Sequence, residues 1–169
     1  TLDLKTKTGQ EIFRRLIKKS DVLIENFRPG TLKKLGLSYP VLSQWNPRLI
    51  LCSITGAGQR GRAAKLAGHD LNYLALSGLL SLLKDSAGRP VIPDFQIIDL
   101  AAGYRSVFLM LSALYQRART GRGCWIDSSM LEAGKEMARL YGNGSKSLFE
   151  ALPNYRIYPT RDRRFVAFA

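Results

Sequence analysis

The stretch Arg48-Leu-Ile-Leu-Cys-Ser-Ile-Thr55 determines the predicted fold. It is short, almost wholly apolar and followed by a polar, glycine-containing loop, which is typical of a strand buried on both faces of a parallel sheet. Shorter apolar runs of the same kind lie at 22–24 and 124–127, and segments with the apolar spacing of helices lie around them. This alternation predicts an α/β fold, with a Rossmann-like, mostly parallel sheet and flanking helices.

The chain has 169 residues, a length that suits one domain and part of a second. Residues 1–141 carry the strand and helix alternation and are predicted to form part of a large α/β domain. Residues 142–153 read as a flexible linker, and 154–169 as the truncated start of a small domain that opens with a β-hairpin. Because both ends of the chain fall inside predicted elements, we expect an internal fragment of a longer protein.

Composition favours a folded, soluble protein. Hydrophobic residues make up 46% of the chain and charged residues 23%, which are globular proportions. A long helix at 100–118 is apolar almost all round, so we expect it to be buried on every side. Its most apolar part is interrupted by Arg105 and is too short to span a bilayer, so no membrane association is expected. Two cysteines, 72 residues apart, suggest neither a disulfide framework nor a metal site, and a cytoplasmic setting is the default.

The chain is strongly basic. Lysine and arginine number 26 against 13 acidic residues, which gives a formal charge of +13. Such a surface attracts anions, so the partners to consider are nucleic acid, an acidic membrane or a phosphorylated small molecule. The cations are scattered rather than blocked, and no RNA-binding motif or stacking stripe accompanies them, so nucleic acid is not the expected partner.

Two side chains could carry chemistry. His69, the single histidine, lies where a loop becomes a helix beside Asp70, and it could exchange protons near neutral pH. Asp99 precedes the long helix, at the edge where α/β sheets bind ligands, and it could act as nucleophile or base. A capping role explains either residue equally well from local sequence. The turn containing Arg28 directly follows a predicted strand, where a phosphate-bearing ligand could bind.

Seven blocks of sequence add information that spacing does not give. They are DVLIENFRPG (21–30), LGL (35–37), NPRLI (46–50), GHDLNY (68–73), IDLAAG (98–103), RTGRG (119–123) and IDSSML (126–131). Together, and in this order, they closely resemble the class III CoA-transferases of the CaiB/BaiF type and their relatives, the α-methylacyl-CoA racemases. The resemblance covers nearly the whole chain. It implies a two-domain enzyme about twice this long, an interlocked homodimer, and coenzyme A or acyl-CoA as substrate with no permanently bound cofactor.

The resemblance also implies roles for individual residues. Asp99 matches the catalytic aspartate of the family, and His69 matches the histidine that racemases pair with it. Lys5 matches a lysine that contacts CoA, and Lys34 stands where racemases usually have an arginine that binds a CoA phosphate. Tyr73 is expected near the acyl thioester, and Arg28 completes the expected CoA-binding residues.

Two reactions follow from the resemblance. In CoA transfer to a carboxylic acid, the expected first choice, Asp99 attacks the thioester to give a mixed anhydride and then an enzyme-bound CoA thioester. In 2-methylacyl-CoA epimerisation, His69 and Asp99 exchange the α-proton through an enolate. The context of Phe95 resembles the transferases, whereas His69 favours the racemases. A basic binding protein built on an inactive or truncated enzyme is a further alternative, as is a remnant that folds only with a partner chain.

Overall fold

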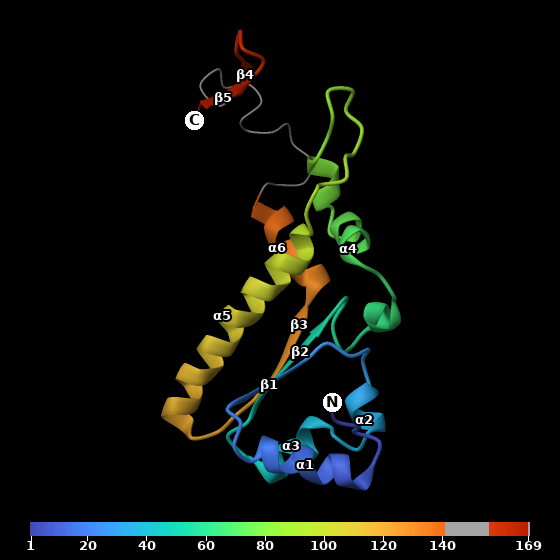
Figure 1. Cartoon of the computed structure of the whole chain (residues 1–169), viewed down its shortest axis with the longest axis vertical. Coiled ribbons are helices and arrows are strands. Elements are labelled where there is room, and N and C mark those ends of the chain that lie inside the picture. Colours follow the sequence, from blue (N-terminus) through green and yellow to red (C-terminus); the bar gives the residue numbers. More distant parts are fainter. Residues whose placement is uncertain (141–155, 169) are drawn as a thin grey trace.

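The computed structural model describes residues 1–140 and 156–168 (Figure 1). Its centre is a three-stranded parallel sheet with the strand order β1-β2-β3. The strands are β1 (Val22–Glu25), β2 (Ile50–Thr55) and β3 (Trp125–Ser129). All but one of the residues of β2 are buried, as the apolar run at 48–55 predicts for a central strand. The predicted α/β class and parallel sheet are confirmed.

Three short helices gather at the end of the sheet where the strands begin (Figure 1). They are α1 (Lys7–Ile17), α2 (Thr31–Lys34) and α3 (Tyr39–Trp45). Thr6 caps α1 because its hydroxyl accepts a hydrogen bond from the Gly9 N–H at 3.0 Å. One hydrophobic cluster holds this end together: Ile17, Leu37, Leu42, Leu49 and Leu51.

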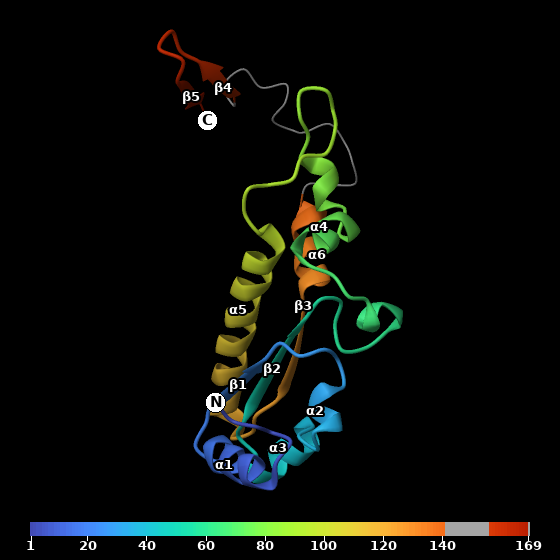
Figure 2. The same ribbon diagram turned by 45° about the vertical axis from the view of Figure 1, so that its right-hand side comes forward.

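The opposite end of the sheet is covered by α4 (Asp70–Leu76), α6 (Met130–Leu140) and the start of α5 (Ile97–Thr120). Two 3-10 turns, Arg62–Lys65 and Leu79–Leu82, flank α4. A second hydrophobic cluster fills the space between these helices, with Tyr73, Leu74, Leu79 and Ile98 at its centre. Both views show α5 running back along the sheet toward the first cluster (Figure 2). It therefore forms the crossover between β2 and β3.

The prediction that the long helix is buried on every side is wrong. Its sheet-facing residues Ile98, Ala102, Ser106 and Ala113 are buried. Large apolar side chains at helical spacing on the other side are half or more exposed: Leu100, Tyr104, Val107, Phe108, Leu111 and Tyr115. Hydrophobicity all round a helix predicts burial only where a second layer covers it, and within the described residues the layers lie on one side of α5.

Polar contacts hold α5 within this layer. The helix has 24 residues, more than the predicted apolar stretch, and by length and composition alone it could cross a membrane. However, Arg105 makes a bidentate ion pair with Glu136 of α6, in which Nε and Nη2 donate to the two carboxylate oxygens at 2.9 and 3.0 Å. The buried Ser106 hydroxyl lies 2.8 Å from that of Ser128 in β3. These contacts hold α5 against α6 and β3 as the crossover helix of the α/β fold.

The C-terminal hairpin is confirmed as antiparallel strands β4 (Arg156–Pro159) and β5 (Phe165–Phe168). Ile157 lies opposite Ala167 in this hairpin. The predicted linker at 142–153 lies outside the described residues. The division into a large domain and the start of a small one therefore stays a prediction.

Candidate active site

Asp99 lies in the first turn of α5, at the end of the sheet toward which the strands point (Figure 1). It is not the residue that caps the helix, as local sequence allowed, because Gln96 occupies that position. The Asp99 side chain is exposed. Partial removal from water raises the pKa of its carboxyl group, and the nearby charge of Asp70 raises it further, whereas His69 lowers it. Asp99 therefore holds a proton more readily than an ordinary aspartate.

His69 is brought to the same place by α4. It occupies the position before the first residue of that helix, and its backbone N–H donates to Asn72 Oδ1 at 2.9 Å. The side chain is exposed. Asp70, the next residue in the chain, accepts a hydrogen bond from the Asp99 N–H at 2.9 Å, so the structure brings His69 and Asp99 to the same place. His69 thus occupies the N-cap position of α4 and lies beside Asp99 at the same time.

Asp70 joins these two residues and was missed by the sequence analysis as a functional side chain. It is 7% exposed, and its Oδ1 accepts hydrogen bonds from the backbone N–H groups of Ile98 and Asp99, at 2.7 and 2.9 Å. These two N–H groups belong to the first turn of α5, where they have no partner within the helix. The only signal in the sequence was the position of Asp70 directly after His69.

Tyr73 lies against the loop that follows β2. Its ring is 3% exposed, and its hydroxyl donates to the Leu66 carbonyl at 3.5 Å. A Cβ atom on Gly56 would lie 1.8 Å from the Tyr73 hydroxyl oxygen, so only glycine fits at that position. Asp127 fixes the same loop because both its carboxylate oxygens accept from the Gln59 N–H, at 3.0 and 2.9 Å. The loop beside Tyr73 is thus tied to β3.

The predicted CoA-binding cations are exposed. The Gln10 side-chain amide donates to both the Leu4 and the Leu35 carbonyls at 3.0 Å, so it joins the segments that carry Lys5 and Lys34. Arg28 is exposed in the loop that follows β1. Among the residues described, no hydrogen bond or ion pair joins these three cations to His69 or Asp99. The structure therefore brings His69 and Asp99 together, and joins the segments that carry Lys5 and Lys34.

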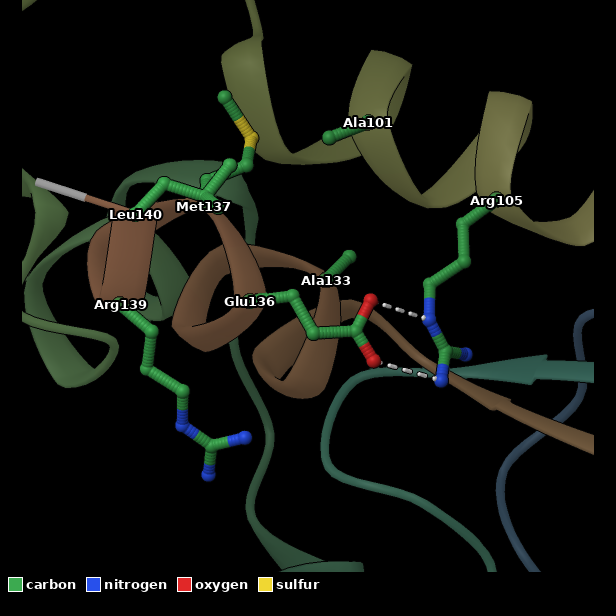
Figure 3. Close-up of a pocket in the computed structure, with 7 residues that line it drawn as sticks. All are labelled: Ala101, Arg105, Ala133, Glu136, Met137, Arg139 and Leu140. Carbon is green, nitrogen blue, oxygen red and sulfur yellow. Dashed lines mark hydrogen bonds and ion pairs between the residues drawn. The ribbon is translucent and has the colours of Figure 1, made fainter.

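A hollow of about 420 Å³ between α5 and α6 is a separate feature (Figure 3). It is lined by Ala101, Arg105, Ala133, Glu136, Met137, Arg139 and Leu140. Ala101 is two residues from Asp99, which places the two side chains on roughly opposite sides of the helix. The hollow contains the ion pair between Arg105 and Glu136, so it belongs to the packing of the two helices and not to the candidate site. Within the part of the chain that the structure describes, no cluster of side chains could hold a metal ion.

Comparisons with known proteins agree with the sequence resemblance. The family model described as CoA-transferase family III matches residues 1–169. The chain is 42% identical to the human protein named alpha-methylacyl-CoA racemase, over 98% of this chain and 47% of that protein. It is 38% identical to succinate–glutarate CoA-transferase of Agrobacterium fabrum, over 95% of this chain and 42% of that protein.

A solved structure supports the fold. The crystal structure of a CaiB/BaiF family protein from Brucella suis matches with a TM-score of 0.84 and 36% identity, over 98% of this chain and 46% of that one. The chain thus spans roughly half the length of the relatives it matches. The named relatives are enzymes, both CoA-transferases and acyl-CoA racemases. The chain belongs to the CoA-transferase family III.

Proposed function

We propose that this protein interconverts the two epimers of a 2-methylacyl-CoA, with His69 and Asp99 as its acid–base pair. The observation that carries the proposal is the meeting of the starts of α4 and α5, which places His69 within electrostatic reach of Asp99. Racemisation needs two proton-exchanging groups at one carbon, whereas transfer through an aspartate needs only one. The geometry therefore favours the reaction that the sequence placed second.

The proposed reaction moves one proton at a time. The α-hydrogen of an acyl-CoA is acidified by the thioester carbonyl, so a neutral His69 imidazole can remove it and leave an enolate. Protonated Asp99 then delivers its own proton to the opposite face of the same carbon. The raised pKa of Asp99 supports this role because it increases the fraction that carries a proton. The opposite direction uses ionised Asp99 as base and protonated His69 as acid.

Binding of the CoA portion is assigned to Lys5, Lys34 and Arg28. All three are exposed cations, and Gln10 joins the segments that carry the first two. Phosphate groups are the parts of CoA that such cations recognise, so CoA acts here as part of the substrate and not as a resident cofactor. The family resemblance assigns Tyr73, beside the loop that follows β2, a position near the thioester. The proposal also includes a homodimer, which the family resemblance implies, and a cytoplasmic setting, which is the default for the chain's two cysteines.

CoA transfer to a carboxylic acid is the second candidate. Phe95, four residues before Asp99, gives this segment the transferase-like form, and several relatives carry transferase names. In this reaction the Asp99 carboxylate attacks the thioester carbonyl and expels CoA thiolate, which leaves a mixed anhydride. The thiolate then attacks the acyl carbon of Asp99 and releases the acyl group as its carboxylate. The acceptor acid finally takes CoA over, again through an anhydride of Asp99.

Incorporation of deuterium separates these two reactions. The purified protein is incubated in heavy water with one epimer of a 2-methylacyl-CoA, and the α-carbon is analysed by proton NMR and mass spectrometry. Racemisation predicts deuterium at the α-carbon and the appearance of the other epimer. His69→Ala and Asp99→Asn should each abolish formation of the other epimer, because inversion needs both groups, whereas the control Glu11→Gln, on the exposed face of α1, should form it normally.

A parallel assay supplies an unlabelled carboxylic acid and follows formation of its CoA thioester. CoA transfer predicts a new thioester without α-deuterium, and this product should be retained in His69→Ala and lost in Asp99→Asn. That result would show that the reaction is transfer and not racemisation. Neither product, together with retention of a labelled oligonucleotide that weakens steeply with salt, would favour the basic binding protein.

A further inference from the structure

Asp70 is a buried carboxylate that the proposed chemistry does not use. Its Oδ1 accepts the N–H groups of Ile98 and Asp99, across 28 and 29 residues of sequence. The start of α5 has no capping bond from the side chain of Gln96, so Asp70 takes that place from another helix. A carboxylate is also the group that the positive end of a helix favours. The contact is therefore a cap supplied from α4 to α5.

The position of Asp70 in the chain gives this cap a second consequence. Asp70 follows His69 by one peptide bond, and one of the two N–H groups that it binds is that of Asp99 itself. A single side chain thus connects the backbone of one member of the acid–base pair to the backbone of the other. Asn72 secures the first member, since its Oδ1 accepts the His69 N–H at 2.9 Å.

We propose that Asp70 is a positioning residue that sets the separation between His69 and Asp99 by clamping the first turn of α5 to the first turn of α4. This inference rests on the proposed function, because the separation matters only if both residues act on the same substrate. Asp70 does not touch substrate in this role: it is 7% exposed, and its Oδ1 faces the backbone of α5. Its effect is exerted through Asp99.

The charge of Asp70 gives the clamp a measurable signature. Three influences act on Asp99: partial burial and the charge of Asp70 raise its pKa, and His69 lowers it. Replacing Asp70 by Asn removes the negative charge but keeps a carbonyl oxygen that can accept both N–H groups. The pKa of Asp99 should then fall, because a carboxylate without a like charge beside it ionises more readily. A residue that merely fills space would not produce this shift.

The first experiment needs no substrate. The γ-carboxyl carbon of Asp99 is titrated by carbon-13 NMR in the wild type and in Asp70→Asn, with Asp99→Asn used to identify the signal. The matched control is Asp85→Asn, because Asp85 also accepts backbone N–H groups, from Ala87 and Arg89, in a separate turn. Asp70→Asn should lower the pKa of Asp99, and Asp85→Asn should leave it unchanged. An Asp99 titration that is identical in the wild type and Asp70→Asn would overturn the proposal.

The second experiment measures α-proton exchange. Asp70→Ala lacks the acceptor, so kcat should fall on the order of 10-fold to 100-fold, as misplacement of a reacting group by about 1 Å does, while KM stays near the wild-type value. Asp70→Asn should keep most of kcat, and in the direction where Asp99 is the base, the acid limb of its pH profile should move to lower pH. Equal kcat in wild type and a folded Asp70→Ala would overturn the proposal, and if Asp70→Ala does not fold, the Asn variant decides it. Absence of exchange in the wild type would refute the proposed racemisation, while the NMR titration still decides the role of Asp70.

Discussion

Gly134 lies where α6 meets the two helices that carry the candidate catalytic pair. A Cβ atom at this position would lie 2.7 Å from Ile98 Cδ1 and 2.7 Å from the Ser77 hydroxyl oxygen, closer than non-bonded atoms approach. Ile98 is fully buried and Ser77 nearly so, so neither can move without disturbing the second hydrophobic cluster. Gly134→Ala therefore forces α6 away from α4 and α5.

The expected magnitude is the balance of two opposing effects. Crowding a packed core costs about 1–3 kcal/mol. Alanine in place of glycine inside a helix contributes about 1 kcal/mol in the favourable direction. The net expectation for Gly134→Ala is a loss of about 0–2 kcal/mol. Gly103, inside α5, provides the matched control because a Cβ atom there meets nothing within 4 Å, so Gly103→Ala should stabilise by about 0.5–1 kcal/mol.

Urea denaturation followed by circular dichroism measures both free energies of unfolding. The steric reasoning predicts that Gly134→Ala is less stable than Gly103→Ala by about 0.5–3 kcal/mol, which lowers Tm by up to several degrees. Adding Ile98→Val, which removes the Cδ1 atom, should recover part of the loss in Gly134→Ala although it destabilises the wild type. Equal stability of the two alanine variants would refute the reasoning, and so would strictly additive effects in the double variant.

Three further predictions test other contacts. Lys34→Ala should weaken calorimetric binding of CoA by about 5–10-fold, as loss of a phosphate contact does, whereas Lys18→Ala, directly after α1, should not. Equal affinities of Lys34→Ala and the wild type would remove Lys34 from the CoA site. Arg117→Ala should lower the free energy of unfolding in urea by about 1–3 kcal/mol, because this largely buried guanidinium donates to the backbone carbonyl groups of Asp21 and Arg48. The control Asp21→Asn, which removes only the exposed carboxylate of the ion pair, should change that free energy little. Similar losses in both variants would contradict this prediction. Asp99→Asn should be more stable than the wild type at pH 7, because the pKa of Asp99 is raised in the folded state and its ionisation therefore opposes folding. This gain in the free energy of unfolding should vanish as the pH falls below 3.8, the ordinary pKa of an aspartate. A gain that does not depend on pH would contradict the raised pKa as its cause.

Local patterns in the sequence predict the elements of this fold well. The apolar run at 48–55 became β2, and the apolar stretches before and after it became its two parallel neighbours. The hairpin was predicted equally well, because apolar and polar residues alternate in its two strands on either side of a polar turn. These features depend on residues that are close in the chain, so periodicity and turn chemistry are sufficient to find them.

Contacts between distant segments were beyond the sequence. Asp70 binds N–H groups of Ile98 and Asp99, and Gln10 binds carbonyl groups of Leu4 and Leu35, yet neither side chain carries a local pattern that indicates its partner. The exposed side of α5 was mispredicted for the same reason, since its hydrophobicity does not say which layers cover it. Local sequence marked His69 and Asp99 as candidates for chemistry but explained each of them by capping as well, and only the family resemblance predicted that they act as a pair.

The helix α5 is fastened to the rest of the molecule at three levels along its length. Asp70 binds its first turn, Ser106 lies against Ser128 of the sheet, and Arg117 binds the segments that lead into β1 and β2. About 27 Å of helix separates Asp99 from Arg117 at 1.5 Å per residue. One residue inserted between Ser106 and Arg117 would turn one end of the helix by about 100° relative to the other. The contacts of Asp70, Ser106 and Arg117 with their partners could then no longer all form. The length of α5 in whole residues is thus part of what aims the Asp99 carboxylate.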